Sequence, residues 1–421
     1  MKRYLEYYEN EWPENIEELR AVENKPFVGY LNGGGIKYTV IPKPADPNTY
    51  VTFTAQKDNS SIGLYMLSTN QTLEYSTDTI TWNTFDTTTN ISLNNEDKVY
   101  VRGVLNEDNT YDNYTQFEMS GKIAASGNCN AIWNYQNLHA PLKAYCGYRI
   151  FFECTSLTTA PELPATVLAD SCYESVFDGC TNLTTVPELP ATTLTNKCYK
   201  YMFYQCASLT TVPELPATTL ADYCYAYMFY GCASLTTSPE LPATELSEGC
   251  YYCMFYTCTS LTTVPELPAT TLVTNCYAGM FDECTSLTTA PELPATTLAP
   301  YCYHCMFYGC ASLTTSPELP ATTLAEGCYR EMFVYCNSLT VSPELPATTL
   351  TVKCYYCMFY GCTKLNHIKC LATNKPASDC TASWVYKVSS TGTFVKHPDM
   401  TSWSTGTNGI PSGWTVVDAE L

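Results

Sequence analysis

The feature that most constrains the fold is a repeat of 26 residues, marked by a cysteine at constant phase. A fixed period in this range is typical of solenoids, because so short a unit closes a hydrophobic core only by stacking on its neighbours. The repeat therefore predicts a solenoid over residues 146–385. The marking cysteines are Cys154, Cys180, Cys206, Cys232, Cys258, Cys284, Cys310, Cys336 and Cys362.

Each unit has two parts with different patterns. The segment Leu209–Val212 is short and rich in β-branched residues, so it predicts one strand of a parallel ladder that ends at Pro213. Leu220, Cys224 and Met228 recur at steps of four, which predicts a helical turn or short helix forming the convex wall. The unit is thus expected to be one coil of an α/β solenoid.

A second row of cysteines runs at the same period, eight residues before each cysteine of the first row. Eight residues of helix span about 12 Å, which exceeds the roughly 7 Å reach of a disulfide. We therefore expect buried free thiols that behave as small apolar side chains. The second row is Cys146, Cys172, Cys198, Cys224, Cys250, Cys276, Cys302, Cys328 and Cys354, and Cys380 extends it.

The repeat resembles the leucine-rich repeats of the BspA type. The elements that carry the resemblance are Met228-Phe229, Cys232, Ser234-Leu235-Thr236 and Pro239, which recur in register along residues 146–385. This sequence departs from the family's pattern in two ways. Its unit is a few residues longer than is common in that family, and it lacks an export signal. The resemblance implies a right-handed horseshoe or rod that serves adhesion.

Outside the solenoid, the patterns predict four further segments, so that the whole fold is mainly β with short helices. Residues 1–24 have helical spacing and predict an acidic arm, and residues 121–145 and 386–421 predict atypical caps. Residues 25–120 predict an immunoglobulin-like β-sandwich. Its expected strands are Pro26–Leu31, Ile36–Ile41, Tyr50–Ala55, Ile62–Leu67, Leu73–Ser76, Ile80–Phe85 and Val99–Leu105.

Charge limits the partners. The formal net charge of −20 argues against a nucleic-acid partner, because phosphate binding needs clustered Lys and Arg. No apolar run is long enough to predict a membrane span, and the first residues lack the apolar core of a secretory signal, which indicates either a mature chain or synthesis in a cytosol.

The cytosolic start fits a second resemblance. The segments 11–30 and 33–42 look like the beginning of virion proteins of tailed gut phages, which are made in the host cytosol. This resemblance implies a virion structural protein, with a fibre or a capsid decoration as the expected form. The alternative is a BspA-like adhesin on a bacterial cell surface.

One position of the unit is a constant glutamate between Pro and Leu, and we call these residues the acidic ladder. In-register stacking would bring the carboxylates about 5 Å apart, which requires compensation. Three forms remain open: hydrogen bonds from backbone or threonine with solvent screening, weak Ca²⁺ binding, or a basic partner. The acidic ladder is Glu162, Glu188, Glu214, Glu240, Glu266, Glu292, Glu318 and Glu344.

Tyrosine dominates the positions that vary between copies. Because tyrosine offers a large contact area with few rotatable bonds, a variable tyrosine strip is the predicted contact surface for a host glycan or protein. The alternative is that these rings only pack between coils. The predicted surface is Tyr201, Tyr204, Tyr227, Tyr230, Tyr252, Tyr256, Tyr308, Tyr356 and Tyr360.

Catalytic motifs are not found. The four histidines fall in no metalloprotease or nucleophile pattern, and the glutamates repeat identically where a glycosidase needs one distinctive pair. The outer cysteines of the Cys-x-x-Cys pairs lie two coils apart, so they are not expected to share a metal ion. These pairs are Cys250/Cys253, Cys302/Cys305 and Cys354/Cys357.

The sequence thus predicts a non-enzymatic adhesion protein without a cofactor. Residues 1–120 are expected to attach it to other virion or cell-surface proteins, and the solenoid is expected to bind the host. Assembly into a homo-oligomer stays open, since no heptad run supports a coiled coil.

Overall fold

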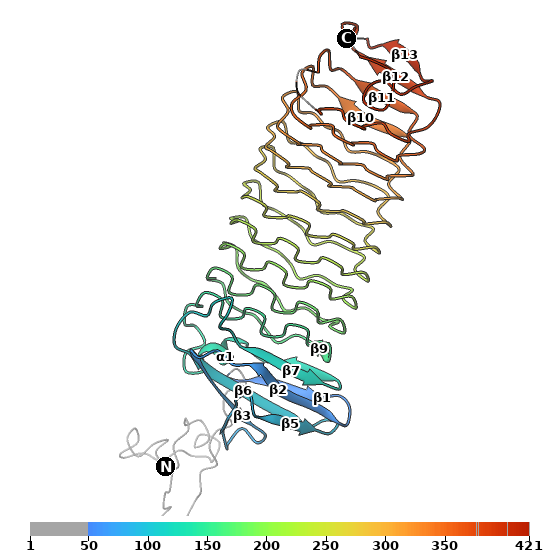
Figure 1. Ribbon diagram of the computed structural model, residues 1–421. Helices are drawn as coiled ribbons and strands as arrows, with labels where there is room; N and C mark the ends of the chain where they lie inside the picture. Colours follow the sequence, from blue (N-terminus) through green and yellow to red (C-terminus); the bar gives the residue numbers. More distant parts are fainter. Residues whose placement is uncertain (1–48, 376, 378, 402, 421) are drawn as a thin grey trace, which may run out of the picture.

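The computed structural model describes residues 49–375, 377, 379–401 and 403–420. They form a pair of β-sheets at one end, followed by a long stack of coils that ends near the C-terminus (Figure 1). The helical arm predicted for residues 1–24 and the hairpin predicted around residues 26–41 lie outside the described residues.

The first two sheets contain most of the regular strands. One sheet has the order β4-β3-β6-β1-β8-β9 and the other has the order β5-β2-β7. All pairs among β1 to β8 are antiparallel, whereas β8 and β9 are parallel. The strands are β1 (Val51–Ala55), β2 (Ser60–Met66), β3 (Gln71–Ser76), β4 (Asn83–Thr84), β5 (Asn90–Leu93), β6 (Lys98–Leu105), β7 (Gln116–Ser120), β8 (Ile123–Ser126) and β9 (Leu157–Thr159).

Alternating burial explains these strands. In β6, Val99, Val101 and Leu105 are buried, whereas the alternating residues between them are half-buried, as expected for a strand with one face on a core. Across the two sheets, the rings of Phe53 and Phe117 lie 5.2 Å apart. The expected runs overlap β1, β2, β3, β4 and β6, although only two residues of the run Ile80–Phe85 form β4. Strands β5, β7 and β8 were not anticipated because each is only four or five residues long. The immunoglobulin-like type stays a prediction.

The N-terminal sheets and the solenoid share one core. Strand β8 comes from the segment predicted as a cap, and it pairs with β9 of the first coil. The ring of Phe117 in β7 stacks on Phe151 at 5.4 Å. Helix α1 (Asn130–Asn134) follows β8, and its Trp133 contacts Tyr173 of the solenoid at 5.7 Å. Because sheet and aromatic stack both continue, no break in packing separates the two parts.

The wall predicted to contain helical turns is built from non-helical turns, such as residues 197–205 of one coil, so that prediction was wrong. We call this side of the coils the turn wall. Within the described residues the only α-helix is α1. In a representative coil, Lys197, Tyr201 and Gln205 have φ values of 56°, 57° and 56°, so every fourth residue is left-handed. Two residues point inward and the next two point outward, and this produces the four-residue spacing that resembles a helix in sequence.

Hydrogen bonds between coils support this strained backbone. A left-handed conformation costs a non-glycine residue about 1–2 kcal/mol. The same residues donate their backbone N–H to the next coil, as Tyr201 does to Ala226 at 3.0 Å and Tyr227 to Tyr252 at 2.8 Å. Tyr199 and Phe203, midway between the left-handed residues, also donate to the next coil. The alternating amides, such as those of Lys200 and Met202, close turns within the coil. The wall is therefore a parallel ladder of turns that exists only while neighbouring coils are in register.

The opposite side of each coil is extended but mostly lacks regular strands. The predicted strand at Leu209–Val212 is wrong, since none of these residues lies in a strand or bridge, and equivalent positions of other coils form single bridges such as Thr289 with Thr315. The two prolines of each Pro-Glu-Leu-Pro segment cannot donate to a ladder, which limits the pairing. Regular parallel strands return at the end of the stack, as β10 (Val341–Leu345), β11 (His367–Cys370), β12 (Thr393–Lys396) and β13 (Thr415–Asp418).

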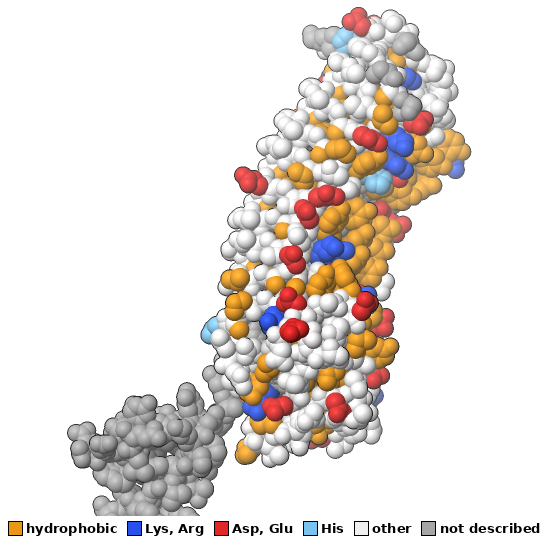
Figure 2. Space-filling model, turned by 60° about the vertical axis from the view of Figure 1, so that its left-hand side comes forward, with side chains coloured by type: hydrophobic (Ala, Val, Ile, Leu, Met, Phe, Trp, Pro, Cys, Tyr) orange, Lys and Arg blue, Asp and Glu red, His pale blue; other side chains and the backbone are white. Residues whose placement is uncertain are grey.

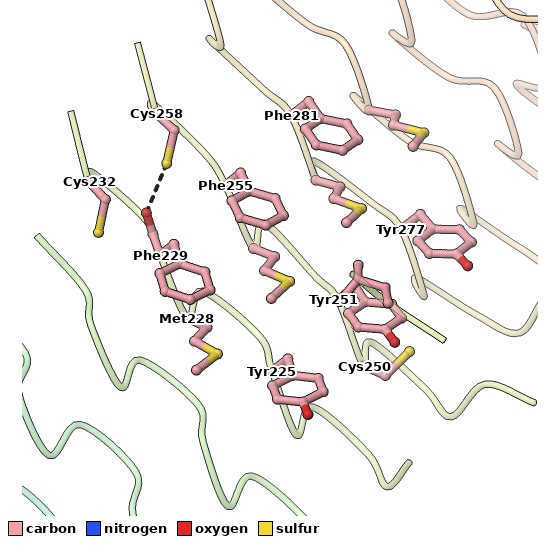
Figure 3. Packing of buried hydrophobic residues seen from close by; sticks show 14 of the residues in the cluster. Tyr225, Met228, Phe229, Cys232, Cys250, Tyr251, Phe255, Cys258, Tyr277 and Phe281 are labelled. Atoms are coloured by element: carbon pink, nitrogen blue, oxygen red, sulfur yellow. Dashed lines mark hydrogen bonds between the residues drawn. The ribbon is translucent and has the colours of Figure 1, made fainter. Parts of the chain in front are cut away.

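Two aromatic stacks fill the interior. Successive phenylalanines, such as Phe229 and Phe255, lie 5.6 Å apart with nearly parallel rings, and Tyr225 and Tyr251 lie 5.8 Å apart in the same way (Figure 3). Each of these four side chains is at most 2% exposed. Trp384 contacts Phe359 and Tyr355, the last phenylalanine and the last tyrosine of the two stacks, so its indole closes both. The aromatic stacks therefore run uninterrupted from the N-terminal sheets to the far cap.

The cysteines of the two rows line this interior as free, buried thiols, which confirms the prediction. Cys258 donates its S–H to the carbonyl oxygen of Phe229 in the preceding coil at 3.1 Å (Figure 3). The equivalent bond recurs from Cys180 to Cys362 at 2.9–3.2 Å. Cysteine is thus favoured at this position because it is apolar enough for the core and still carries a donor.

We predict that replacing one of these thiols weakens the stack. Cys258→Ala removes a buried donor and a sulfur atom, so the free energy of unfolding in urea should fall by about 1–3 kcal/mol. Cys357→Ala is the control, because Cys357 is half-buried in the outer part of the wall. Equal losses in the two variants would contradict the role assigned to the thiol-to-carbonyl bond.

Candidate binding surface

The turn wall holds its outward side chains in a fixed frame. Tyr201 and Tyr204 are half-buried, whereas Tyr199 and Phe203 on the same turns are at most 1% exposed. The backbone of Tyr201 is fixed by its bond to the next coil. Outward residues therefore vary between copies without disturbing the core, and each presents its side chain in one direction.

Six of the nine predicted surface tyrosines form one cluster, which we call the tyrosine patch. Tyr201 stacks on Tyr227 at 4.7 Å, and Tyr204 stacks on Tyr230 at 4.5 Å. The rings pack between coils, as the alternative predicted, and each remains partly exposed, so the contact role stays a prediction. The patch spans three successive coils and consists of Tyr201, Tyr204, Tyr227, Tyr230, Tyr252 and Tyr256.

The other three predicted tyrosines lie farther along the wall. Tyr308 and Tyr360 are linked through Tyr335, with ring distances of 5.9 and 5.7 Å. Tyr356 lies under the guanidinium of Arg330 at 5.0 Å. Tyr335, which is 42% exposed, was missed because it stands one position later than the tyrosines of the other copies. Its exposure makes it part of the same outer surface.

Two acidic residues flank the tyrosine patch at the position that follows the core phenylalanine. Asp178 precedes it, and burial raises the pKa of its carboxyl to about 7. Asp282 follows it, and burial, together with the charges of Glu283 and Glu331, raises the pKa of its carboxyl to about 8. Burial also raises the pKa of Tyr201 to about 12, so its hydroxyl stays a neutral donor at neutral pH.

Beyond Asp282, three side chains with different chemistry converge. The Sγ atom of Cys305 lies 3.2 Å from Nε2 of His304 and 3.4 Å from Oε2 of Glu331. Arg330 donates two hydrogen bonds to the other carboxylate oxygen of Glu331. The hydrogen bond from His304 and the charge of Arg330 lower the pKa of Glu331 to about 2.

Sequence reasoning missed this cluster because it paired Cys305 with Cys302. Cys302 points into the core, fully buried. Glu331, which lies next to Cys305, is 26 residues later, at the same position of the next coil. The repeat period could therefore have predicted that these two side chains are neighbours. Among the described residues this is the only group of three or more His, Cys, Asp or Glu whose ligand atoms converge in this way.

The acidic ladder lies exposed on the extended side of the coils. Glu344 forms an ion pair with Lys369 at 2.8 Å. Within the described part of the chain, the other seven ladder carboxylates have no side-chain hydrogen bond, so the prediction of backbone or threonine donors was wrong for them. Solvent screening weakens the repulsion between such exposed charges at physiological ionic strength, and weak Ca²⁺ binding or a basic partner stays a prediction for them.

A hollow in the described residues lies elsewhere. It has a volume of about 630 Å³ at the junction of the N-terminal sheets and the first coil, where Trp133, Leu138 and Leu142 line it. Its lining contains no histidine, cysteine, serine or threonine. The hollow lies apart from the tyrosine patch.

The face shown in Figure 2 has hydrophobic side chains, a class that includes tyrosine, in a band along the solenoid. Acidic side chains are scattered along this band, and basic ones are few (Figure 2). No helix in the described residues has the length and apolar character that a membrane crossing requires.

Coils of this kind, with a constant leucine and phenylalanine interior and a variable outer wall, define a leucine-rich repeat solenoid. The BspA type leucine-rich repeat region matches residues 134–251 and 224–366, with 6 copies. These matches cover more than half of the chain, and the chain belongs to this family. A search of curated proteins found no match, and a search of solved structures found none either.

The raised pKa of Asp178 predicts a pH-dependent stability. Between the ordinary value of about 3.9 and about 7, the unfolded chain has lost a proton that the folded chain keeps, so stability falls as pH rises through this range. At pH 8, the free energy of unfolding in urea should therefore be about 1–3 kcal/mol higher for Asp178→Asn than for the wild type. At pH 4 the two values should be nearly equal.

Asp112→Asn is the control for this measurement, because Asp112 is exposed. Its effect should be small at both pH values. A stability difference for Asp178→Asn that does not change between pH 4 and pH 8 would show that this carboxyl is not held neutral by burial.

Proposed function

We propose that this chain is a non-enzymatic adhesion protein whose solenoid binds a host glycan or protein through the tyrosine patch. The observation that carries the proposal is the gathering of six tyrosines from three successive coils into one contiguous, partly exposed surface. Membership of the BspA-type family supports an adhesin-type role.

The construction of the patch favours binding. A side chain that is already ordered loses little conformational entropy when a partner docks. The rings stack on one another, and the backbone beneath them is fixed by hydrogen bonds between coils. Tyrosine also combines an apolar ring with a hydroxyl that can hydrogen-bond, which suits both sugars and protein surfaces.

The charge around the patch defines the class of partner. With a net charge of −20, the chain repels polyanions. Lys200, beside the patch, lies over the ring of Tyr201 at 4.9 Å and faces Glu174 at 3.9 Å, so its charge is already engaged. The chemistry thus favours a neutral glycan or a protein surface without acidic clusters.

Family membership favours display on a bacterial cell surface, with residues 1–120 joining the solenoid to other surface proteins. The virion role predicted first from the sequence, a fibre or a capsid decoration, rests on the resemblance of segments 11–30 and 33–42, which lie outside the described residues, and no comparison supports it. Cell-surface display is therefore the proposed location.

Binding of the full chain to an array of glycans and to host surface proteins tests the proposal. The double variant Tyr227→Ala and Tyr230→Ala should lose at least about tenfold in affinity, or roughly 1.4 kcal/mol, because both residues lie in the middle of the patch. Tyr65→Ala, which changes an exposed residue of β2 in the N-terminal sheets, is the control and should bind like the wild type. Thermal unfolding checks that each variant is folded.

Unchanged binding by the double variant would contradict the assignment of the patch. Chemical conversion of a bound glycan by the wild type, measured as release of new reducing ends, would contradict the non-enzymatic role.

A further inference from the structure

The cluster at the far end of the tyrosine patch has the chemistry of a metal site. It offers a thiol from Cys305, an imidazole nitrogen from His304 and a carboxylate oxygen from Glu331. Thiolate, imidazole and carboxylate are the three ligand types that zinc takes in proteins. His304 and Glu331 are 28% and 22% exposed at their side chains, so an ion in solution can reach them.

The distances among the three ligand atoms fit one ion. They are 3.2 Å from sulfur to nitrogen, 3.4 Å from sulfur to oxygen and 3.7 Å from nitrogen to oxygen. Bonds of about 2.0–2.3 Å at tetrahedral angles around zinc separate the ligand atoms by about 3.3–3.6 Å. We propose that His304, Cys305 and Glu331 bind a zinc ion. Binding transfers the thiol proton to solvent and leaves a thiolate on the metal.

Neighbouring groups complete the site. Arg330 donates at 3.0 and 3.1 Å to the carboxylate oxygen of Glu331 that faces away from the cluster, and such outer contacts orient a metal ligand. Asp282 lies one coil earlier, within electrostatic range of Cys305 and Glu331. Its side chain is only 8% exposed, and its Oδ1 has no hydrogen-bond partner among the described residues. A water molecule would fill the fourth position.

The internal repeat shows that this combination is specific to one place. Cys253 and Cys357 occupy the same position as Cys305 in other coils. Tyrosine precedes both of them, at Tyr252 and Tyr356, where Cys305 has His304. The position of Glu331 is Gly279 in the coil after Cys253 and Ser383 in the coil after Cys357. Only one of the three half-buried cysteines therefore has nitrogen and oxygen ligands beside it.

Zinc at this site would join two consecutive coils, since His304 and Cys305 come from one coil and Glu331 from the next. The site lies where the tyrosine patch ends, next to Asp282. The bound ion would therefore hold the wall in register at the point where the stacking of the outer tyrosine rings ends, while the inner aromatic stacks continue.

Alkylation of the full chain provides a test that needs no variant. Cys305 and Cys357 are both half-buried, so iodoacetamide followed by mass spectrometry reports both thiols in one sample. One equivalent of Zn²⁺ should slow modification of Cys305 at least tenfold relative to chelator-treated protein and leave the rate of Cys357 unchanged. An unchanged rate at Cys305, or an equal slowing at both thiols, would overturn the proposal.

Variants then identify the ligands. In competition with a chromophoric zinc chelator, the wild type and Cys357→Ser should bind one Zn²⁺ alike. Cys305→Ser and His304→Gln should lose at least tenfold in affinity. With Co²⁺ in place of zinc, the thiolate charge-transfer absorption should be present in Cys357→Ser and absent in Cys305→Ser. Equal zinc affinity in all four proteins would refute the ligand assignment.

Discussion

Stacking of successive coils in register is the interaction on which the rest of this structure depends. The left-handed residues of the turn wall are unfavourable in isolation and persist because their amides donate to the next coil. The aromatic stacks repeat the same spacing inside, at 5.6 Å between Phe203 and Phe229 and again between Phe229 and Phe255. The thiols add a third contact between coils, to the carbonyl of each preceding phenylalanine. No coil has a complete core or a complete set of hydrogen bonds alone.

This division between inner and outer residues explains how one scaffold carries a specific surface. The inward pairs of each turn are nearly constant, whereas the outward pairs range from Tyr201 and Tyr227 to Gly279 and Glu331. Because the backbone of these positions is fixed by the stack, a change of side chain alters the surface and leaves the frame intact. The tyrosine patch and the cluster at Cys305 are two results of the same construction.

The repeat, the buried leucines and phenylalanines and the unpaired thiols could be predicted from the sequence, because each follows from periodicity and burial. The turn wall could not, since two-in, two-out turns give Leu220, Cys224 and Met228 the spacing of a helix. Left-handed backbone at tyrosine and lysine leaves no compositional signal, because those conformations are held by the neighbouring coil. Tyr335 was missed through a shift of one position, and the Cys305 cluster because its members belong to two coils.

Location of the sulfur atoms by anomalous diffraction from crystals of the chain tests the stacking most directly. The account predicts two straight rows of separate cysteine sulfurs, with successive atoms spaced like the phenylalanine rings, 5.6–5.8 Å apart. Sulfur pairs at about 2.05 Å, the length of a disulfide, or rows that break between coils would contradict it.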